Sequence, residues 1–206
     1  WYGQNLLGEP KFESSDSTIL GTIVHYFAEQ ASLRLKPENP DKLVADYLST
    51  QKVESPAEIQ ALWKDMSNEL IKGCIHGHPK PLATEQFMFH KLLPGIYVGG
   101  STDAIVDLGY GNGTVSIRDY KTASTKPSGI SYAYRLQAHI YAFLATHYLG
   151  HKVSQIELQF VTRPTKTLPC RHFSFTEPFT EENLATITDQ LQLIAESVDF
   201  WNKNPD

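Results

Sequence analysis

The chain has 206 residues, 41% of them hydrophobic, and a formal net charge of −5. This length and apolar content are typical of a single globular domain with a buried core, and they exclude an intrinsically disordered chain. Its two cysteines are too few for a disulfide framework. No apolar run reaches membrane-spanning length and no signal peptide is evident, so we expect a cytoplasmic protein outside the membrane.

Helical patterns occupy the amino-terminal part of the chain. Apolar residues at helical spacing predict a helix at about 16–35 and a shorter one at about 41–48. Ser55-Pro56-Ala57-Glu58 combines an N-cap, a first-turn proline and a capping-box acid, so a third helix is expected to begin there. Gly73 supplies its stop. We therefore expect a helical part at about 16–73.

Strand patterns follow this helical part. A strand is expected at 85–89, and alternating apolar residues predict two more at 100–106 and 114–121. The glycine-rich stretch 109–113 tolerates positive φ and favours a tight hairpin between the second and third strands.

The rest of the chain alternates between helix and strand. We expect a helix at 131–149, strands at 156–160 and 172–175, and a final helix at about 180–202. This order predicts an α/β (α+β) fold in which helices flank a central mixed β-sheet. We expect one domain over residues 1–206, with its core at about 83–175.

Asp119-Tyr120-Lys121 closes the second strand of the predicted hairpin, and Asp103 stands in the first. Side chains alternate between the faces of a strand, so Asp119 and Lys121 share one face of theirs. Carboxylates suit Mg²⁺ and Mn²⁺, and a lysine can neutralise charge on a phosphate. Taken alone, an Asp-x-Lys sequence is more often a solvated surface pair.

Four short motifs give this hairpin a context. In chain order they are Gly21-Thr22-Ile23-Val24-His25, Gly100-Ser101-Thr102-Asp103, Asp119-Tyr120-Lys121-Thr122 and Gln137-Ala138-His139-Ile140-Tyr141. Together they resemble the RecB-like branch of the PD-(D/E)XK nuclease superfamily, where G-x-x-x-H, G-x-x-D, D-Y-K-T and Q-x-x-x-Y occur in this order. The resemblance covers some three-fifths of the chain and implies a restriction-endonuclease-like core.

The resemblance also implies the residues of an active site. His25, Asp103, Asp119 and the backbone carbonyl of Tyr120 are the expected metal ligands. Lys121 matches the catalytic lysine, which would act together with Asp103 and Asp119. By itself His25 also fits a boundary position on an amphipathic helix.

Three further residues are implied around this site. Gln137 and Tyr141 match a helical motif that contacts DNA and supports the active site. They are four residues apart and therefore share a helix face, which a plain polar–aromatic pair would also do. Glu85 corresponds to an upstream acidic position of the family.

Mg²⁺ or Mn²⁺ is the implied cofactor. Some relatives hold an iron–sulfur cluster through a set of cysteines that this chain lacks, so we expect no cluster. The chain has no Gly-x-x-x-x-Gly-Lys-Ser/Thr loop, and we expect no use of ATP. His76-Gly77-His78, with Cys74 nearby, lacks a second ligand pair at a zinc-site spacing, so zinc is not expected.

The resemblance predicts a metal-dependent deoxyribonuclease, specifically an exonuclease in recombination, repair or phage DNA processing. The implied partners are DNA, either single-stranded or with free ends, and a recombination or helicase protein. A hydrolase of small phosphate esters is one alternative. Another is a non-catalytic nucleic-acid-binding or assembly module on the same fold, which the acidic net charge favours.

Basic residues gather around the motifs in spite of the acidic total. Arg118, Lys121 and Arg135 are among them. We expect this local excess of positive charge to suit a phosphate backbone, with strongly salt-dependent binding.

Overall fold

The computed structural model describes residues 15–109 and 113–204, and five helices and five strands lie within these ranges. The helices are α2 (Asp16–Ser32), α3 (Pro40–Ser49), α4 (Pro56–Cys74), α5 (Tyr132–Leu149) and α6 (Glu181–Lys203). The strands are β1 (Ala83–Leu93), β2 (Ile96–Asp107), β3 (Thr114–Ala123), β4 (Lys152–Thr162) and β5 (Arg171–Pro178). The predicted turn includes 110–112, which lie outside the described residues. Within the described ranges, no helix has the length and apolar character needed to span a bilayer.

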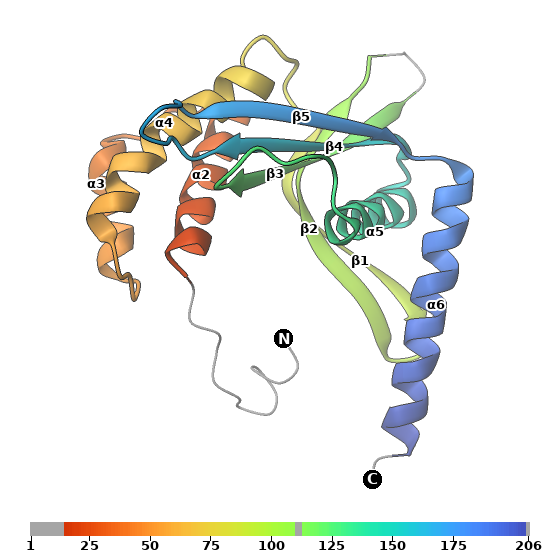
Figure 1. Ribbon diagram of the computed structural model, residues 1–206. Helices are drawn as coiled ribbons and strands as arrows, with labels where there is room; N and C mark the ends of the chain where they lie inside the picture. The colour runs from red at the N-terminus through yellow and green to blue at the C-terminus, as the bar shows by residue number, and fades with distance from the viewer. Residues whose placement is uncertain (1–14, 110–112, 205–206) are drawn as a thin grey trace.

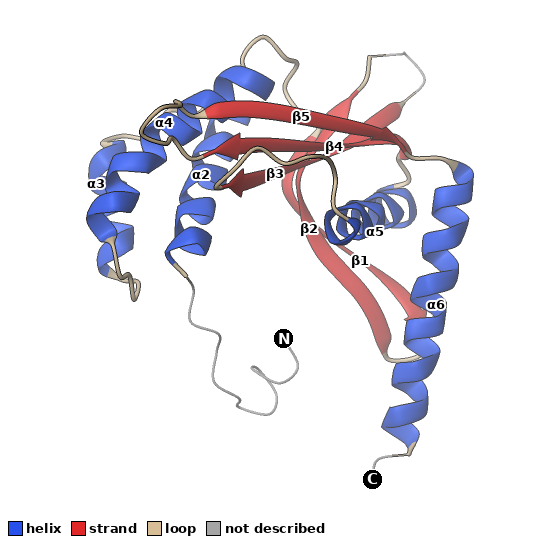
Figure 2. Ribbon diagram, viewed as in Figure 1, coloured by secondary structure: helices blue, strands red, loops and turns tan. Residues whose placement is uncertain are grey.

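The five strands form one mixed sheet in the order β1-β2-β3-β4-β5 (Figure 2). β3 and β4 pair in parallel, and the other neighbours pair antiparallel. Parallel neighbours need a crossover, and α5 provides it between β3 and β4. The predicted α/β fold with a mixed sheet and flanking helices is confirmed.

Each face of the sheet is covered by its own group of helices (Figure 1). One apolar cluster joins α2, α3 and α4 to Tyr120 of β3 and Val161 of β4. The other joins α5 and α6 to residues that include Ile105, Ile117 and Ile156. Odd-numbered Val115 and Ile117 therefore face α5, as the predicted alternation requires, whereas even-numbered Tyr120 faces the opposite helices.

The strand pairing opens a gap beside the second half of β3. β2 pairs with β1 along most of its length, but it pairs with β3 only from Ala104 to Asp107. Ala104 lies opposite Arg118, so the next opposed positions would be Asp103 and Asp119. At that point β1 and β2 continue away from β3 as a long ribbon (Figure 1). The edge of β3 beyond Arg118 consequently faces side chains of β2 rather than its backbone.

The helix boundaries differ from the sequence prediction at two places. α2 ends at Ser32, and Arg34 has a φ of 61°, which stops the helix before residue 35. α4 continues through Gly73 to Cys74, so Gly73 is not its stop. A Cβ at Gly73 would lie 2.3 Å from the ring of His172, so close packing against β5 requires glycine there.

The start of α4 is also held differently from the prediction. The Ser55 side chain makes no capping hydrogen bond. Instead, the Asp16 carboxylate accepts hydrogen bonds from the backbone N–H groups of Glu54 and Ser55, at 3.0 and 2.7 Å. The first turn of α2 is thereby tied to the start of α4.

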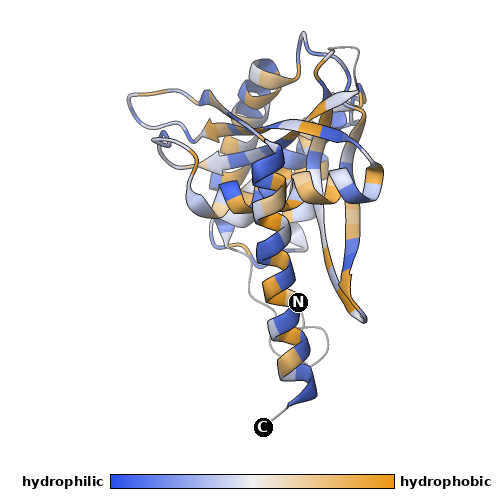
Figure 3. Cartoon of the chain, turned by 90° about the vertical axis from the view of Figure 1, so that its right-hand side faces the viewer, coloured by the Kyte–Doolittle hydropathy of each residue, from blue (hydrophilic) through white to orange (hydrophobic). Residues whose placement is uncertain are grey.

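α6 begins at the predicted place, and its second half extends beyond the sheet. Thr180 and Asn183 form a reciprocal capping box at its start. Its first half buries Ile187 and Leu191 against the core. Apolar residues continue into its second half, where Ile194 and Trp201 are exposed (Figure 3).

Candidate metal centre

The candidate centre lies where β2 separates from β3 and α2 covers the opening. His25 of α2 directs its Nδ1 toward Asp103 of β2, 3.4 Å from Oδ1. The other carboxylate oxygen of Asp103 accepts a hydrogen bond from the backbone N–H of Tyr120. One carboxylate therefore connects the helix to the free edge of β3.

Glu85 approaches the same carboxylate from β1. Its neighbours Thr84 and Gln86 pair with Ala104 and Thr102, so Glu85 stands opposite Asp103. Glu85 has a φ of 46°, a left-handed conformation that is rare for a residue with a side chain. Such strain is concentrated at functional sites. His25, Glu85 and Asp103 each offer a ligand atom within 4.8 Å of the other two.

Asp119 lies beside this group of three. It is buried, and its Oδ2 is 2.7 Å from the Nζ of Lys121 in an ion pair. The charges of Asp103 and His25 both act on its carboxyl group. The structure thus gathers His25, Glu85 and Asp103 most closely, with Asp119 next to them and turned toward Lys121.

The centre carries more negative charge than its neighbours compensate. Burial and the charge of Asp103 raise the pKa of Asp119 to about 6. Burial and the charges of Asp103 and Glu29 raise the pKa of Glu85 to about 7. Burial alone would lower the pKa of His25, but its hydrogen bond to Asp103 and the carboxylate charges outweigh burial and raise it.

Tyr120 contributes its backbone to the centre and its side chain to the core. Burial raises the pKa of its phenol to about 12, and its hydroxyl lies 3.5 Å from Ser32 Oγ. In a strand, the N–H and C=O of one residue point to the same edge. Because the N–H of Tyr120 meets Asp103, its carbonyl also points toward the opening between β2 and β3.

A line of polar contacts joins Lys121 to α5. Lys121 Nζ donates to Gln137 Oε1 at 3.0 Å, and Gln137 Nε2 donates to the Tyr141 hydroxyl at 2.9 Å. The ring of Tyr134 lies 5.0 Å from the same Nζ. A Cβ at Gly100 would be 2.9 Å from the Tyr141 ring, so the glycine lets this tyrosine reach the centre.

The donor set suits a hard divalent cation. It offers carboxylate oxygens in excess, one imidazole nitrogen and a backbone carbonyl, all on the opening between β2 and β3. Oxygen ligands are those that Mg²⁺ and Mn²⁺ prefer. Burial and neighbouring carboxylate charge both raise the carboxyl pKa values of Glu85 and Asp119, and a bound cation would offset both effects.

Comparison with known proteins decides the family. The family model of the PD-(D/E)XK nuclease superfamily matches residues 1–202. The chain belongs to this superfamily. Nucleases of the superfamily use divalent metals, in agreement with the donor set. A search of the curated proteins finds no significant match.

A solved structure shares the fold of this PD-(D/E)XK nuclease. A crystal structure from Eubacterium rectale, described as a "Putative exonuclease", aligns with a TM-score of 0.53 and 13% identity, covering 92% of this chain and 68% of that one. At this identity the likeness shows the fold alone. The crystal structure of SSO0001 aligns with a TM-score of 0.35 and 16% identity, covering 83% and 85% of the two chains.

Sequence reasoning missed one residue beside the nuclease centre, Tyr134. Tyr134 stands three residues before Gln137, and this helical spacing would have placed it on the face of α5 that meets Lys121. Glu85 was a candidate from the resemblance, and the strand register places it opposite Asp103.

The expected basic surface is partly wrong. Arg118 is buried and bonded to Glu157, with distances of 2.8 Å from both Nε and Nη2 to Oε2. Arg135 is paired with Glu177 at 2.7 Å. Lys121 is paired with Asp119. These cations serve pairs within the protein, which the spacing of charges along the chain does not reveal.

Proposed function

We propose that this nuclease belongs to the RecB-like branch and cleaves DNA as a metal-dependent exonuclease. The observation that carries the proposal is the convergence of His25, Glu85 and Asp103 beside the Asp119–Lys121 ion pair. A metal-binding acid cluster next to a lysine is the equipment that phosphodiester hydrolysis needs.

Four groups would hold Mg²⁺ or Mn²⁺: the side chains of His25, Asp103 and Asp119 and the carbonyl of Tyr120. Glu85 would complete the acidic set, either directly or through a water. When bound, such a cation polarises the phosphoryl oxygen and lowers the pKa of a water. The Tyr120 N–H fixes the orientation of the Asp103 carboxylate for this task.

Lys121 would stabilise negative charge on the phosphate and orient the attacking water. Its Nζ is held by Asp119 at 2.7 Å and by Gln137 at 3.0 Å, so it is positioned before substrate arrives. Tyr141 fixes Gln137 in turn, at 2.9 Å. Gln137 and Tyr141 would also contact the DNA strand as it passes α5.

The remaining parts of the proposal concern context. Residues 1–206 would act as one nuclease domain in the cytoplasm, on DNA that is single-stranded or has free ends. Recombination, repair or phage DNA processing would supply such ends, with a recombination or helicase protein as partner. The exonuclease mode is supported by the resemblance of the four motifs.

End-labelled single- and double-stranded DNA, incubated at low salt with Mg²⁺, Mn²⁺ or EDTA, tests the proposal. We expect metal-dependent loss of label by the wild type and by Lys126→Ala, whose lysine lies over Phe173 instead. Lys121→Ala and Asp119→Ala should be inactive yet folded. Cleavage by either variant at the wild-type rate would refute their roles. DNA binding without cleavage by a folded wild type would favour the non-catalytic module.

A further inference from the structure

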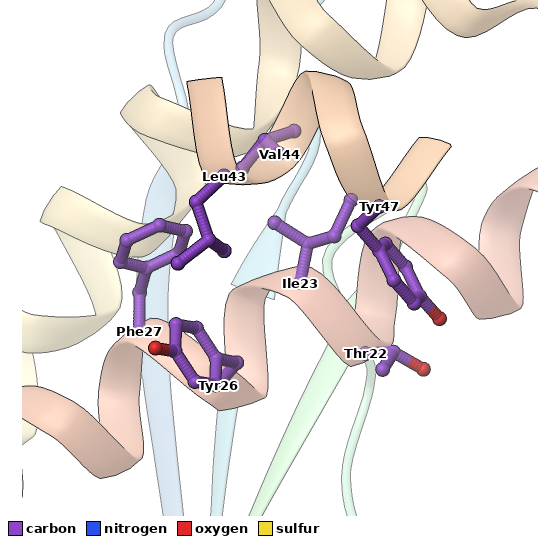
Figure 4. Close-up of a pocket in the computed structure, with 7 residues that line it drawn as sticks. All are labelled: Thr22, Ile23, Tyr26, Phe27, Leu43, Val44 and Tyr47. Atoms are coloured by element: carbon purple, nitrogen blue, oxygen red, sulfur yellow. The ribbon is translucent and has the colours of Figure 1, made fainter. Parts of the chain in front are cut away.

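An apolar pocket of about 280 Å³ lies between α2 and α3 (Figure 4). Its walls include Thr22, Tyr26 and Phe27 from α2 and Leu43, Val44 and Tyr47 from α3. Phe27 is buried and stacks on Trp63 at 4.5 Å between ring centroids, which fixes that wall. Tyr26 and Tyr47 are only half-buried, so aromatic rings remain accessible at the pocket.

The pocket and the candidate metal centre share α2, which contributes residues to both. Thr22 and Tyr26 lie three residues before and one residue after His25 on the same helix. Residues three apart on a helix have Cβ atoms about 5–6 Å from each other, so Thr22 borders both the pocket and His25. From the other side, a Cβ at Gly21 would be 3.3 Å from Oγ1 of Thr122, which directly follows Lys121.

The chemistry of the walls suits a flat aromatic ligand. None of the described lining residues carries a charge, and their polar groups are limited to the hydroxyls of one threonine and two tyrosines. A nucleobase has an apolar face that stacks on aromatic side chains whatever its identity. A phosphate could not be held there, but the metal centre beside the pocket is built for one.

We infer that this pocket takes an unstacked nucleobase of the strand whose phosphate lies at the metal centre. The inference rests on the proposed function, and it specifies the substrate class. A base can enter only after it leaves its stack, so single strands and frayed ends are preferred over paired duplex. Stacking on aromatic walls that offer only three hydroxyls should depend little on base sequence.

A binding cycle tests the pocket without relying on cleavage. Affinities would be measured by fluorescence anisotropy, in Ca²⁺ and in EDTA, for a labelled single-stranded 12-mer and for the same 12-mer with every base removed. The measured quantity is the ratio of the affinity for the 12-mer with bases to the affinity for the 12-mer without bases. Removing one stacking side chain should lower the ratio about tenfold in Tyr47→Ala, because a stacked base contributes about 1–3 kcal/mol.

Three further variants make the result specific. Thr22→Phe fills the pocket from an exposed position and should lower the ratio as Tyr47→Ala does. Tyr47→Phe keeps the ring and should retain the wild-type ratio. Tyr97→Ala removes an exposed tyrosine on β2 outside the pocket and should also leave the ratio unchanged.

An unchanged ratio in both Tyr47→Ala and Thr22→Phe would overturn the inference, as would an equal fall in Tyr97→Ala. Failure of the proposed function has a different signature, because the wild type would then show no metal-dependent cleavage whatever the ratio. If the wild type cleaves DNA and the ratio is unchanged in the variants, the proposed function stands and only the inference about the base pocket is refuted.

Discussion

Two clusters of charged side chains include residues of β3, one under α4 and one in the opening between β2 and β3, and they differ in how their charge is balanced. On the α4 side, Glu157 accepts hydrogen bonds from Arg118, Gln155 and Gln159. In the opening between β2 and β3, the carboxyl groups of the metal centre outnumber the cations that reach them.

The pKa shifts of the two clusters have opposite signs. Burial would raise the pKa of Glu157, but the charge of Arg118 and the hydrogen bonds to Ser116, Arg118 and Gln155 together outweigh burial and lower it. The pKa of Asp119 is instead raised to about 6, because burial and Asp103 outweigh Lys121. A cluster that satisfies itself stabilises the fold, whereas one that lacks positive charge is prepared for a cation from solution.

Arg118→Met is expected to have the largest effect on stability. It leaves the Glu157 carboxylate buried without its cation and removes a 2.7 Å hydrogen bond to the Cys74 carbonyl at the end of α4. Breaking a buried ion pair in this way costs about 3–5 kcal/mol. Urea denaturation would measure the loss.

Lys121→Met is the matched substitution in the other cluster. Asp119 can take up a proton there, so the loss of stability should be smaller although cleavage is abolished. Equal destabilisation by Arg118→Met and Lys121→Met would show that both clusters stabilise the fold, and it would refute the distinction between them.

Whether the sequence predicts each of these two clusters depends on the distance along the chain between the residues that interact. The four motifs locate His25, Asp103 and Asp119-Tyr120-Lys121 because each motif combines residue type with short spacing. The cluster around Arg118 and Glu157 was not predicted. These two residues are 39 positions apart and meet only through the parallel register of β3 and β4.

Local backbone chemistry marks a second limit of prediction. The start of α6 was predicted at about residue 180, and Thr180 caps the helix there, because a helix start depends on adjacent positions. Gly73 was wrongly predicted as a helix stop. In the sequence, a glycine that permits a close contact cannot be told from a glycine that ends a helix. Only the position of His172 in three dimensions separates the two readings.

Divalent cations should stabilise the protein only through the metal centre, which is the cluster whose charge is not balanced. A ligand at 100 times its Kd adds about 2.7 kcal/mol to the free energy of unfolding. We expect Mg²⁺ or Mn²⁺ to raise the Tm of the wild type and of Asp107→Asn, whose exposed carboxylate lies further along β2. Asp103→Asn should abolish the rise. A rise that persists in Asp103→Asn would place the cation elsewhere.

The pH dependence of stability should also separate the clusters, by a smaller amount. In the metal-free protein, the raised pKa values of Glu85 and Asp119 mean that the folded state holds these protons more tightly than the unfolded state. Their contribution to stability is therefore present below about pH 4 and is lost as pH rises toward 7. Glu157, with a lowered pKa, contributes stability that is lost as pH falls through its folded pKa.

Urea denaturation in EDTA at pH 5 and pH 7.5 would measure this dependence. Glu85→Gln should reduce the decline between the two pH values, and the exposed Glu182→Gln should not. The effect of Glu85 is limited because its side chain is only partly removed from solvent, which screens its charge. A decline that is identical in Glu85→Gln would show that this carboxyl is not part of the unbalanced cluster.

Gly100→Ala should have the smallest effect on stability and a clear one on activity. Its Cβ would meet the Tyr141 ring at 2.9 Å, and overpacking of this size, partly offset by the loss of glycine's chain entropy, costs about 1 kcal/mol. Displacing Tyr141 loosens Gln137 and, through it, Lys121. Gly99→Ala is the control, because its Cβ would meet Met88 and Phe87 instead. Reduced kcat in Gly100→Ala alone would show that the unbalanced cluster depends on α5 for its geometry, and equal kcat in both variants would show that it does not.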